Sequence, residues 1–166
     1  MKKGFTFIEL IVVIALLLLL SAAMIVNYNS YTNRERIRQA GLTLKSDLRF
    51  AASKANSGIK PSGCSTTILL SYDVSFIKNC LPEGVSCYTI TPRCSDPDGL
   101  ILANQMTVKF PKEVSLQSDN ETIHFLPLSA GVSFDTGNDS TEIILESISV
   151  NQPITITISS SGVISN

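Results

Sequence analysis

The chain has 166 residues, of which 44% are hydrophobic and 16% are charged. This balance fits a folded protein and excludes an intrinsically disordered one, and the length accommodates one helical anchor and one modest globular domain. The net charge of −1 is unevenly divided, because residues 1–60 carry +6 and the remaining residues carry −7. The acidic C-terminal part argues against a nucleic-acid partner, since proteins that bind nucleic acids present basic surfaces.

The N-terminal segment begins with a short basic leader that ends at Gly4 and is followed by Phe5 and a long apolar run. Between Glu9 and Arg34 the sequence holds no charged residue. About 20 apolar residues are enough to cross a bilayer as a helix, so we expect a membrane-spanning segment that reaches to about residue 26. Glu9 is the anomaly within it, because a carboxylate in lipid is tolerable only when it is paired.

These residues, Lys3-Gly4-Phe5-Thr6 followed by Glu9, resemble the N-terminal signal of the type IV pilin and pseudopilin family. The resemblance implies that a prepilin peptidase removes residues 1–4 by cutting between Gly4 and Phe5, and then methylates the Phe5 amine. It also implies that Glu9 faces the Phe5 ammonium of a neighbouring subunit during assembly. The implied partners are other pilin or pseudopilin subunits, the peptidase, and the inner (cytoplasmic) membrane with its assembly platform. The head would lie outside the cytoplasm, and then in the pilus or pseudopilus.

Two other interpretations of the N-terminus remain open. An ordinary secretory signal peptide has a basic start, an apolar middle and a small-residue cleavage site. Lys2-Lys3, the leucine run and Ser21-Ala22-Ala23 would supply these, with Met24 as the mature start. A simple anchor with an incidental carboxylate is the other interpretation. Neither gives Glu9 a role, which favours the resemblance to pilins.

Helical periodicity continues beyond the apolar run. Apolar or small residues recur at three- and four-residue steps and therefore share one helix face: Ile37, Gly41, Leu44, Leu48, Ala51 or Ala52, and Ala55. Gly58 and Pro61 are stop signals, with Gly58 as the expected C-cap. The pattern predicts one helix over residues 5–58, about 80 Å long at ~1.5 Å per residue. Its second half should pack this stripe against the globular domain.

Four cysteines follow the helix: Cys64, Cys80, Cys87 and Cys94. In an exported domain they predict two disulfides, for which three connectivities are possible. Residues 66–72 and 74–80 suggest two strands around a turn at Ser71-Tyr72-Asp73, which would place Cys64 opposite Cys80 and leave Cys87 to pair with Cys94. A zinc site is the alternative, but the chain has no C-x-x-C spacing and a single histidine.

Beyond Pro61 the sequence changes to a two-residue period. Ile154, Ile156 and Ile158 alternate with hydroxyl side chains, which indicates a half-buried strand. Similar segments, separated by turn residues, occur at 66–71, 85–91, 105–110, 121–126 and 141–150. The sequence therefore predicts an α+β protein in which the long N-terminal helix packs on an antiparallel, β-sandwich-like head over residues 62–166.

Three head segments resemble the GspH/FimT-type minor pseudopilins: Phe125-Leu126-Pro127 with Gly131, Leu81-Pro82-Glu83-Gly84-Val85, and the ending from Ile154 to Ile164. The resemblance implies a structural minor subunit of a type II secretion pseudopilus or a type IV pilus. Two departures are that Gly131 sits two residues later than the family pattern prefers and that four cysteines are no family hallmark. A DNA-binding minor pilin for natural transformation, as the FimT branch implies, and a major pilin remain as alternatives.

The sequence shows no motif of a catalytic, cofactor-binding or metal site, and we expect a structural subunit, not an enzyme. His124, the only histidine, lies on an expected strand and is interpreted as structural. The acidic loops at 96–99 and 135–142 offer oxygen ligands that calcium accepts, but they lack the EF-hand spacing and are interpreted as solvated turns. Arg34, Arg36 and Arg38 are expected just outside the membrane, near lipid headgroups or neighbouring stems.

Overall fold

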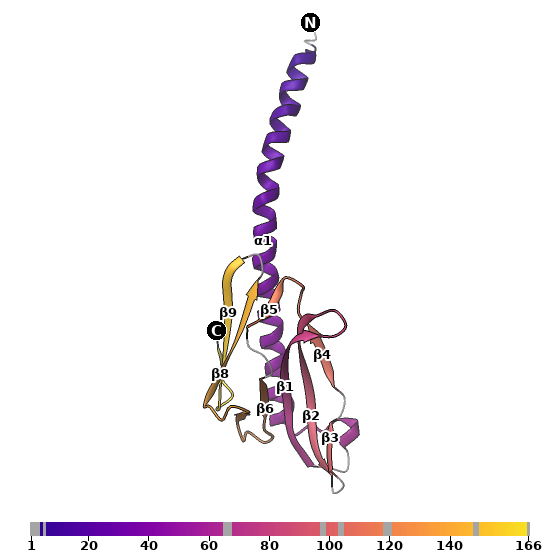
Figure 1. The fold of residues 1–166 in the computed structure, drawn as a ribbon, viewed down its shortest axis with the longest axis vertical. Coiled ribbons are helices and arrows are strands. Elements are labelled where there is room, and N and C mark those ends of the chain that lie inside the picture. The colour runs from indigo at the N-terminus through magenta and orange to yellow at the C-terminus, as the bar shows by residue number, and fades with distance from the viewer. Residues whose placement is uncertain are drawn as a thin grey trace.

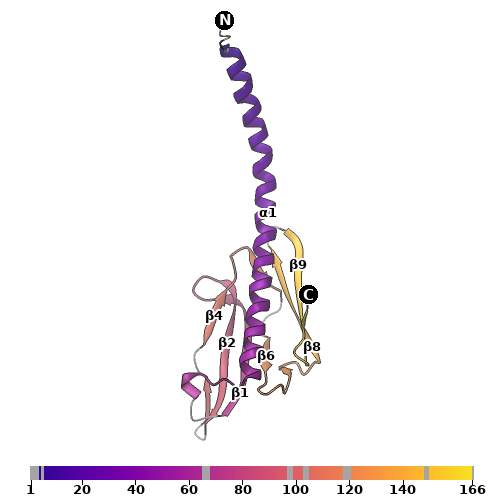
Figure 2. The ribbon, with the colours of Figure 1, turned by 180° about the vertical axis from the view of Figure 1, so that it is seen from behind.

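The computed structural model describes residues 4, 6–64, 68–96, 99–102, 105–117, 121–147 and 150–165. A long N-terminal helix, α1 (Phe7–Asn56), lies with its second half against a head of antiparallel strands (Figure 1). The first half of α1 extends away from the head, as the two opposite views show (Figures 1 and 2). This is the α+β architecture that the sequence predicts.

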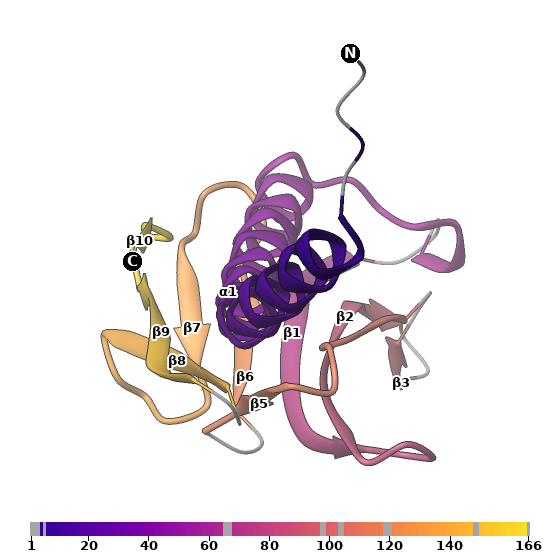
Figure 3. The ribbon, with the colours of Figure 1, turned by 90° about the horizontal axis from the view of Figure 1, so that it is seen from above.

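The head contains two sheets. A short 3₁₀ helix, η1 (Ser62–Cys64), lies between the end of α1 and the first strand of the head. The first sheet has the order β3-β2-β1-β6-β7, with β4 also paired to β2: β1 (Ile68–Cys80), β2 (Val85–Asp96), β3 (Gly99–Leu102), β4 (Met106–Lys109), β6 (Thr122–Phe125) and β7 (Val132–Phe134). The second has the order β10-β9-β8-β5: β5 (Val114–Leu116), β8 (Ser140–Ser147), β9 (Val150–Ser159) and β10 (Ile164–Ser165). α1 contacts both sheets and lies over the angle between them (Figure 3).

The apolar stripe predicted on the second half of α1 is the face that the head buries. Its larger members are at most 3% exposed: Ile37, Leu44, Leu48, Ala51 and Ala55. Burying one leucine side chain stabilises a fold by about 1.5–3 kcal/mol, so this stripe fixes the helix to the sheets. Gly41 lets the helix come close to β9, because a Cβ added there would lie 3.4 Å from Ile154 Cγ2. The helix ends at Asn56 with Ser57 as its C-cap, one residue before the expected Gly58. Gly58 follows with φ 60° and so terminates the helix in the left-handed conformation that glycine favours.

β1 is one continuous strand of 13 residues, so the turn predicted at Ser71-Tyr72-Asp73 is wrong. Ser and Asp favour turns when water solvates them, but here both side chains are buried and hydrogen-bonded to each other, with Ser71 Oγ 2.6 Å from Asp73 Oδ1. The chain reverses instead at residues 81–84. That turn contains a cis Leu81–Pro82 peptide bond and Gly84 with φ 65°.

The β1–β2 hairpin decides the disulfide pairing. Cys80 is bonded to Cys87 across the turn, with 5.9 Å between their Cα atoms, and Cys64 is bonded to Cys94 with a Cα separation of 6.1 Å. The predicted pairing of Cys64 with Cys80 and of Cys87 with Cys94 is therefore wrong, because it assumed a strand break in the middle of β1. All four cysteines are in disulfides, which also contradicts the zinc alternative.

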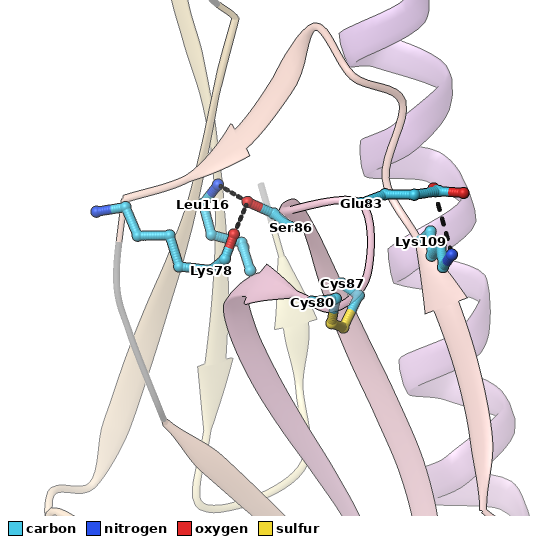
Figure 4. The surroundings of a disulfide bond; sticks show 7 residues. All are labelled: Lys78, Cys80, Glu83, Ser86, Cys87, Lys109 and Leu116. Atoms are coloured by element: carbon cyan, nitrogen blue, oxygen red, sulfur yellow. Dashed lines mark hydrogen bonds and ion pairs between the residues drawn. A yellow bond between two sulfur atoms is a disulfide. The ribbon is translucent and has the colours of Figure 1, made fainter.

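A disulfide, an ion pair and two hydrogen bonds hold the turn of this hairpin in place. The Cys80–Cys87 disulfide lies inside it, and the Glu83 carboxylate forms an ion pair of 3.2 Å with Lys109 at the end of β4 (Figure 4). Ser86 Oγ donates to the Lys78 carbonyl at 3.0 Å and accepts from the Leu116 amide at 3.2 Å (Figure 4). Because Leu116 belongs to β5, this serine joins the hairpin to the second sheet.

Two of the head segments singled out in the sequence meet in space. The segment after β6 turns at residues 126–131, where the Leu126 amide donates to the Gly131 carbonyl at 3.0 Å. The Val132 amide then donates to the Ser160 carbonyl at 2.9 Å, which joins the first sheet to the turn after β9. A Cβ at Gly131, whose φ is 93°, would lie only 2.7 Å from the Ser160 carbonyl oxygen. Only glycine fits this close approach without a shift of the backbone.

Candidate functional site

The N-terminal segment holds the residues to which the sequence assigns a role. Gly4 is exposed and lies outside the helix, and Phe5 lies outside the described residues. Thr6 is the N-cap of α1. The Glu9 carboxylate accepts hydrogen bonds from the Thr6 amide at 3.4 Å and from Thr6 Oγ1 at 3.3 Å. Glu9 therefore caps the first turn of the helix, where the positive end of the helix dipole also favours a carboxylate.

This capping role of Glu9 was not predicted from the sequence. Its signal is present, because Thr6 and Glu9 have the T-x-x-E spacing of a capping box. The carboxylate was interpreted only as a charge within an apolar segment, whereas the structure places it in the first turn of α1. Capping and ionic pairing between subunits are compatible, since a carboxylate can accept several hydrogen bonds.

The first half of α1 is an exposed apolar surface. Twelve large apolar side chains between Phe7 and Leu20 are exposed, with fractions from 45% at Val13 to 79% at Phe7. A contiguous apolar surface of this extent marks a site of contact with lipid or with other proteins. The exposed carboxylate of Glu9 lies at the far end of this surface from the head.

Within the described part of the chain, no helix reaches the length and apolarity that crossing a membrane requires. The segment expected to span the membrane runs to about residue 26, and the side chains of residues 22–27 lie outside the described residues.

A second group of functional interest is a charged cluster on the first sheet. Asp73 on β1 is 5% exposed and accepts from His124 Nδ1 of β6 at 2.7 Å. Its other oxygen lies 2.7 Å from an Arg93 guanidinium nitrogen of β2. His124 Nε2 lies 2.9 Å from Asp135 Oδ1, just beyond β7. One buried carboxylate thus links three strands of the sheet.

His124 is held in its charged form. Burial lowers its pKa, but hydrogen bonds to Asp135 and Asp73 and the charges of both carboxylates outweigh burial, so the pKa of His124 is raised from 6.5. Both ring nitrogens face carboxylate acceptors, which requires both to carry a proton. The hydrogen bond from His124 in turn lowers the pKa of Asp135. The half-buried, structural interpretation of His124 agrees with this geometry.

We expect the stability of the protein to depend on pH through His124. Its folded-state pKa is raised, so its stabilisation is fully present below the unfolded value of about 6.5 and is lost as the pH rises through the folded-state pKa. Asp135 acts in the opposite direction: its lowered pKa makes a contribution that is lost as the pH falls below the ordinary carboxylate range. Thermal unfolding from about pH 2 to 9 covers both arms, since the Asp135 contribution is lost below its ordinary pKa of 3.8, and NMR titration of the single histidine identifies the alkaline arm. A His124 pKa at or below 6.5 would contradict this account.

Of the two acidic loops that were considered for calcium, one has a side-chain contact within the described structure. Asp135 in the loop at 135–142 bonds to His124, whereas residues 97–98 of the other loop lie outside the described residues. Among the described residues, no group of three His, Cys, Asp or Glu side chains is placed to hold a metal ion.

Comparison with known proteins finds a family match at the N-terminus of the chain. Residues 1–25 match the family model described as the prokaryotic N-terminal methylation motif. No solved structure matches this chain. The matched segment contains Gly4, Phe5 and Glu9 and ends within the first half of α1. The chain therefore carries, at its N-terminus, the methylation motif of prokaryotic type IV pilin-like proteins, which supports a structural pilin or pseudopilin subunit that assembles with other such subunits.

Proposed function

We propose that the chain is a minor pseudopilin or pilin subunit that is inserted in the inner membrane, cut between Gly4 and Phe5, methylated at Phe5 and assembled into a fibre. The observation that carries this proposal is that the methylation motif overlaps the first half of α1, whose large apolar side chains are exposed. Stems of this kind hide their apolar surface in lipid before assembly and against one another afterwards. The head would then lie outside the cytoplasm, in a compartment that permits its two disulfides.

Glu9 has the position that assembly through charge pairing needs. Cleavage after Gly4 would create a cation at Phe5, four residues before Glu9 and at the same end of the helix. A carboxylate surrounded by apolar stems is costly until it meets such a partner. In a fibre, the Phe5 ammonium of one subunit and Glu9 of its neighbour would satisfy each other and fix the axial register of the stems.

The head supports a minor subunit of the GspH/FimT type. Segments 125–131 and 154–164, which carry this resemblance, meet where Gly131 closely approaches the Ser160 carbonyl, which accepts a hydrogen bond from the next residue, Val132. We infer a structural role in a type II secretion pseudopilus or a type IV pilus. In such a subunit, residues 1–4 are the leader, residues 5–58 the stem and residues 62–166 the head.

Replacing Glu9 tests the assembly role. Glu9→Gln keeps the acceptor oxygen that caps the helix, because Gln also serves in a capping box, but it removes the charge. We expect Glu9→Gln and Glu9→Leu to insert normally in membranes and to lower incorporation into fibres by more than about tenfold, as expected when a buried ion loses its partner. The ratio of the chain in sheared fibres to that in membranes measures this. Normal incorporation of Glu9→Gln would exclude the pairing role, and Glu35→Gln is the matched control on the stem.

Replacing Gly4 tests processing. We expect Gly4→Ala to block removal of residues 1–4, because the peptidase would have to accept a Cβ at the residue before the cut. The intact mass of the membrane-extracted chain, measured without reductant, reports the result. The wild-type chain should begin at Phe5, be one methyl group heavier and lack four hydrogens for two disulfides. A wild-type chain that begins at Met24 would instead identify a secreted domain.

A further inference from the structure

An exposed side of α1 carries a basic strip, in which Arg38 lies near Pro153 and Ile154 of β9 and Arg49 lies near Gly162 and Ile164 at the end of the second sheet. Arg38 and Arg49 are both exposed and are separated by about three helical turns, ~16 Å along the axis, so they lie on nearly the same side. Leu42 lies between them and is 59% exposed. The view from behind shows this part of α1 in front of the sheets (Figure 2). We call Arg38, Leu42 and Arg49 the stem strip.

Nearby acids leave the stem strip basic. Asp47 is turned toward the head, where its carboxylate accepts a hydrogen bond of 2.5 Å from the Tyr88 hydroxyl. Burial and this hydrogen bond raise the pKa of Tyr88, so the hydroxyl stays protonated and keeps donating. Glu35, three residues before Arg38, accepts a hydrogen bond of 3.5 Å from Gln39, and its single negative charge is outweighed by the two arginines on this side of the helix. Residues 1–60 as a whole carry a net charge of +6, and Arg38 and Arg49 are among the exposed cations of α1, whereas the exposed Arg36 forms an ion pair with Glu113 of the same chain.

The outward face of the second sheet is acidic. Along β8, Thr141, Ile143 and Leu145 are buried, and the alternate residues Glu142, Ile144 and Glu146 point to the other face. We call these three outward residues the head strip. Across the sheet, Glu142 lies opposite Thr157 of β9 and Glu146 lies opposite Ser115 of β5, which are uncharged. No Lys or Arg occurs anywhere in residues 113–166, so this sheet supplies no cation of its own.

The two strips have matching patterns. Each places one apolar side chain between two charges, and the charges are of opposite sign on the two strips. Glu142 and Glu146 are about 13 Å apart along the strand at ~3.3 Å per residue, close to the ~16 Å between the two arginines of the stem strip. Flexible arginine side chains span this difference.

The strips of one molecule lie on opposite sides of the second sheet. Leu145, which belongs to the face opposite the head strip, lies 3.9 Å from a Cβ built at Gly41 of α1. The inner face of the sheet therefore contacts α1, which lies on one side of β8 and β9 (Figure 3). The head strip consists of alternate residues of β8 and so belongs to the other face. A contact between the two strips can form only between different molecules.

We propose that the stem strip of one copy docks on the head strip of a second copy of this chain. The contact is heterologous, because it joins two different surfaces, and contacts of this kind repeat from copy to copy, so copies of this minor subunit would stand next to one another in a short run within the fibre. Exposed ion pairs add little affinity each, but they select the partner and fix the register. This inference rests on the proposed fibre function and names the surface by which neighbouring heads and stems meet.

Photo-crosslinking of the full chain in its native membranes tests the contact. Benzoylphenylalanine in place of Leu42 should give a crosslinked dimer on irradiation. In the adduct, the tryptic peptide 39–45, which holds position 42, should be joined to peptide 113–166, which trypsin leaves whole because it holds no Lys or Arg. A glutamate-specific protease then locates the crosslink near residues 143–146. Benzoylphenylalanine in place of Leu81, which is 88% exposed in the hairpin turn, is the control that should not give this adduct.

Charge reversal adds a test that needs no assumption about geometry. Arg38→Glu with Arg49→Glu, and separately Glu142→Lys with Glu146→Lys, should each lower the dimer yield about fivefold, since each turns attraction into repulsion. The four changes together should restore it. Lys60→Glu with Lys112→Glu alters the net charge as much as the arginine pair, at exposed positions outside both strips, and should leave the yield unchanged.

The outcomes of these experiments distinguish failure of this contact from failure of the proposed function. An adduct with peptide 113–166 together with rescue by the fourfold change supports the contact. An adduct with α1 of the second copy, an adduct with a different protein, or no adduct from a chain correctly processed to Phe5 would overturn it. A chain that is not processed but still gives the adduct would contradict the proposed function and leave the contact standing.

Discussion

Replacement of Cys64 and Cys94 by serine is expected to lower the free energy of unfolding by about 3–4 kcal/mol, as chain entropy predicts for a loop of this length. The bond closes a separation of 30 residues, and both cysteines are fully buried. It ties η1, directly after α1, to the far end of β2. The loop closed by Cys80 and Cys87 spans 7 residues, and the same relation gives about 2 kcal/mol for its removal. Urea or thermal unfolding of the full chain in detergent measures both losses.

Peptide mapping without reduction is the control, because it tests the disulfide pairing from which the two losses of unfolding free energy are calculated. Trypsin cuts after Lys78 and Arg93 and so places Cys80 and Cys87 in one peptide, 79–93. The structure predicts that this peptide carries an internal disulfide and that the peptide with Cys64 is joined to the peptide with Cys94. The alternative pairing would join all three peptides into one species, and its detection would contradict the structure.

Asp73→Asn is expected to destabilise the protein by about 3–5 kcal/mol, the usual cost of breaking a buried ionic network by removing one partner. Asp73 is the acceptor that His124 and Arg93 share, at 2.7 Å from each. Its loss leaves a half-buried imidazolium with only Asp135 and leaves Arg93 without this carboxylate. The free energy of unfolding near pH 6, where His124 is charged, gives the full effect.

A matched comparison separates the charge from a general loss of packing. Asp139→Asn removes an exposed carboxylate from the neighbouring loop and is expected to change stability by less than about 0.5 kcal/mol. The Asp73→Asn protein should also lose most of the upward shift of the His124 pKa, which NMR measures directly. A stable Asp73→Asn protein with an unchanged His124 titration would show that the cluster is held together by other contacts.

Local patterns gave correct predictions where one segment carries its own signal. The stripe from Ile37 to Ala55 was predicted because helix packing repeats every three to four residues, and the structure buries it. The alternation of Ile154, Ile156 and Ile158 predicted a strand, which is part of β9. The methylation motif was evident for the same reason, since Gly4, Phe5 and Glu9 stand at fixed spacing in one segment.

Prediction failed where partners are far apart in the chain. Ser71 and Asp73 were assigned to a turn because their residue types favour turns, yet Asp73 stays in a strand because it meets Arg93 and His124, the latter 51 residues away. The same error changed the pairing of all four cysteines. The capping role of Glu9 was missed for a different reason, since its T-x-x-E signal is local but was interpreted only as a charge in an apolar segment.

The sequence by itself determined the N-terminal motif, the long helix with its buried stripe, and the β-rich class of the head, because each follows from a short-range period or a fixed spacing. Tertiary structure alone decided the disulfide pairing, the cluster around Asp73, and the placement of the basic and acidic strips on opposite sides of the second sheet. These features depend on strand order and register, which arise from packing between distant segments and leave no local trace in the sequence.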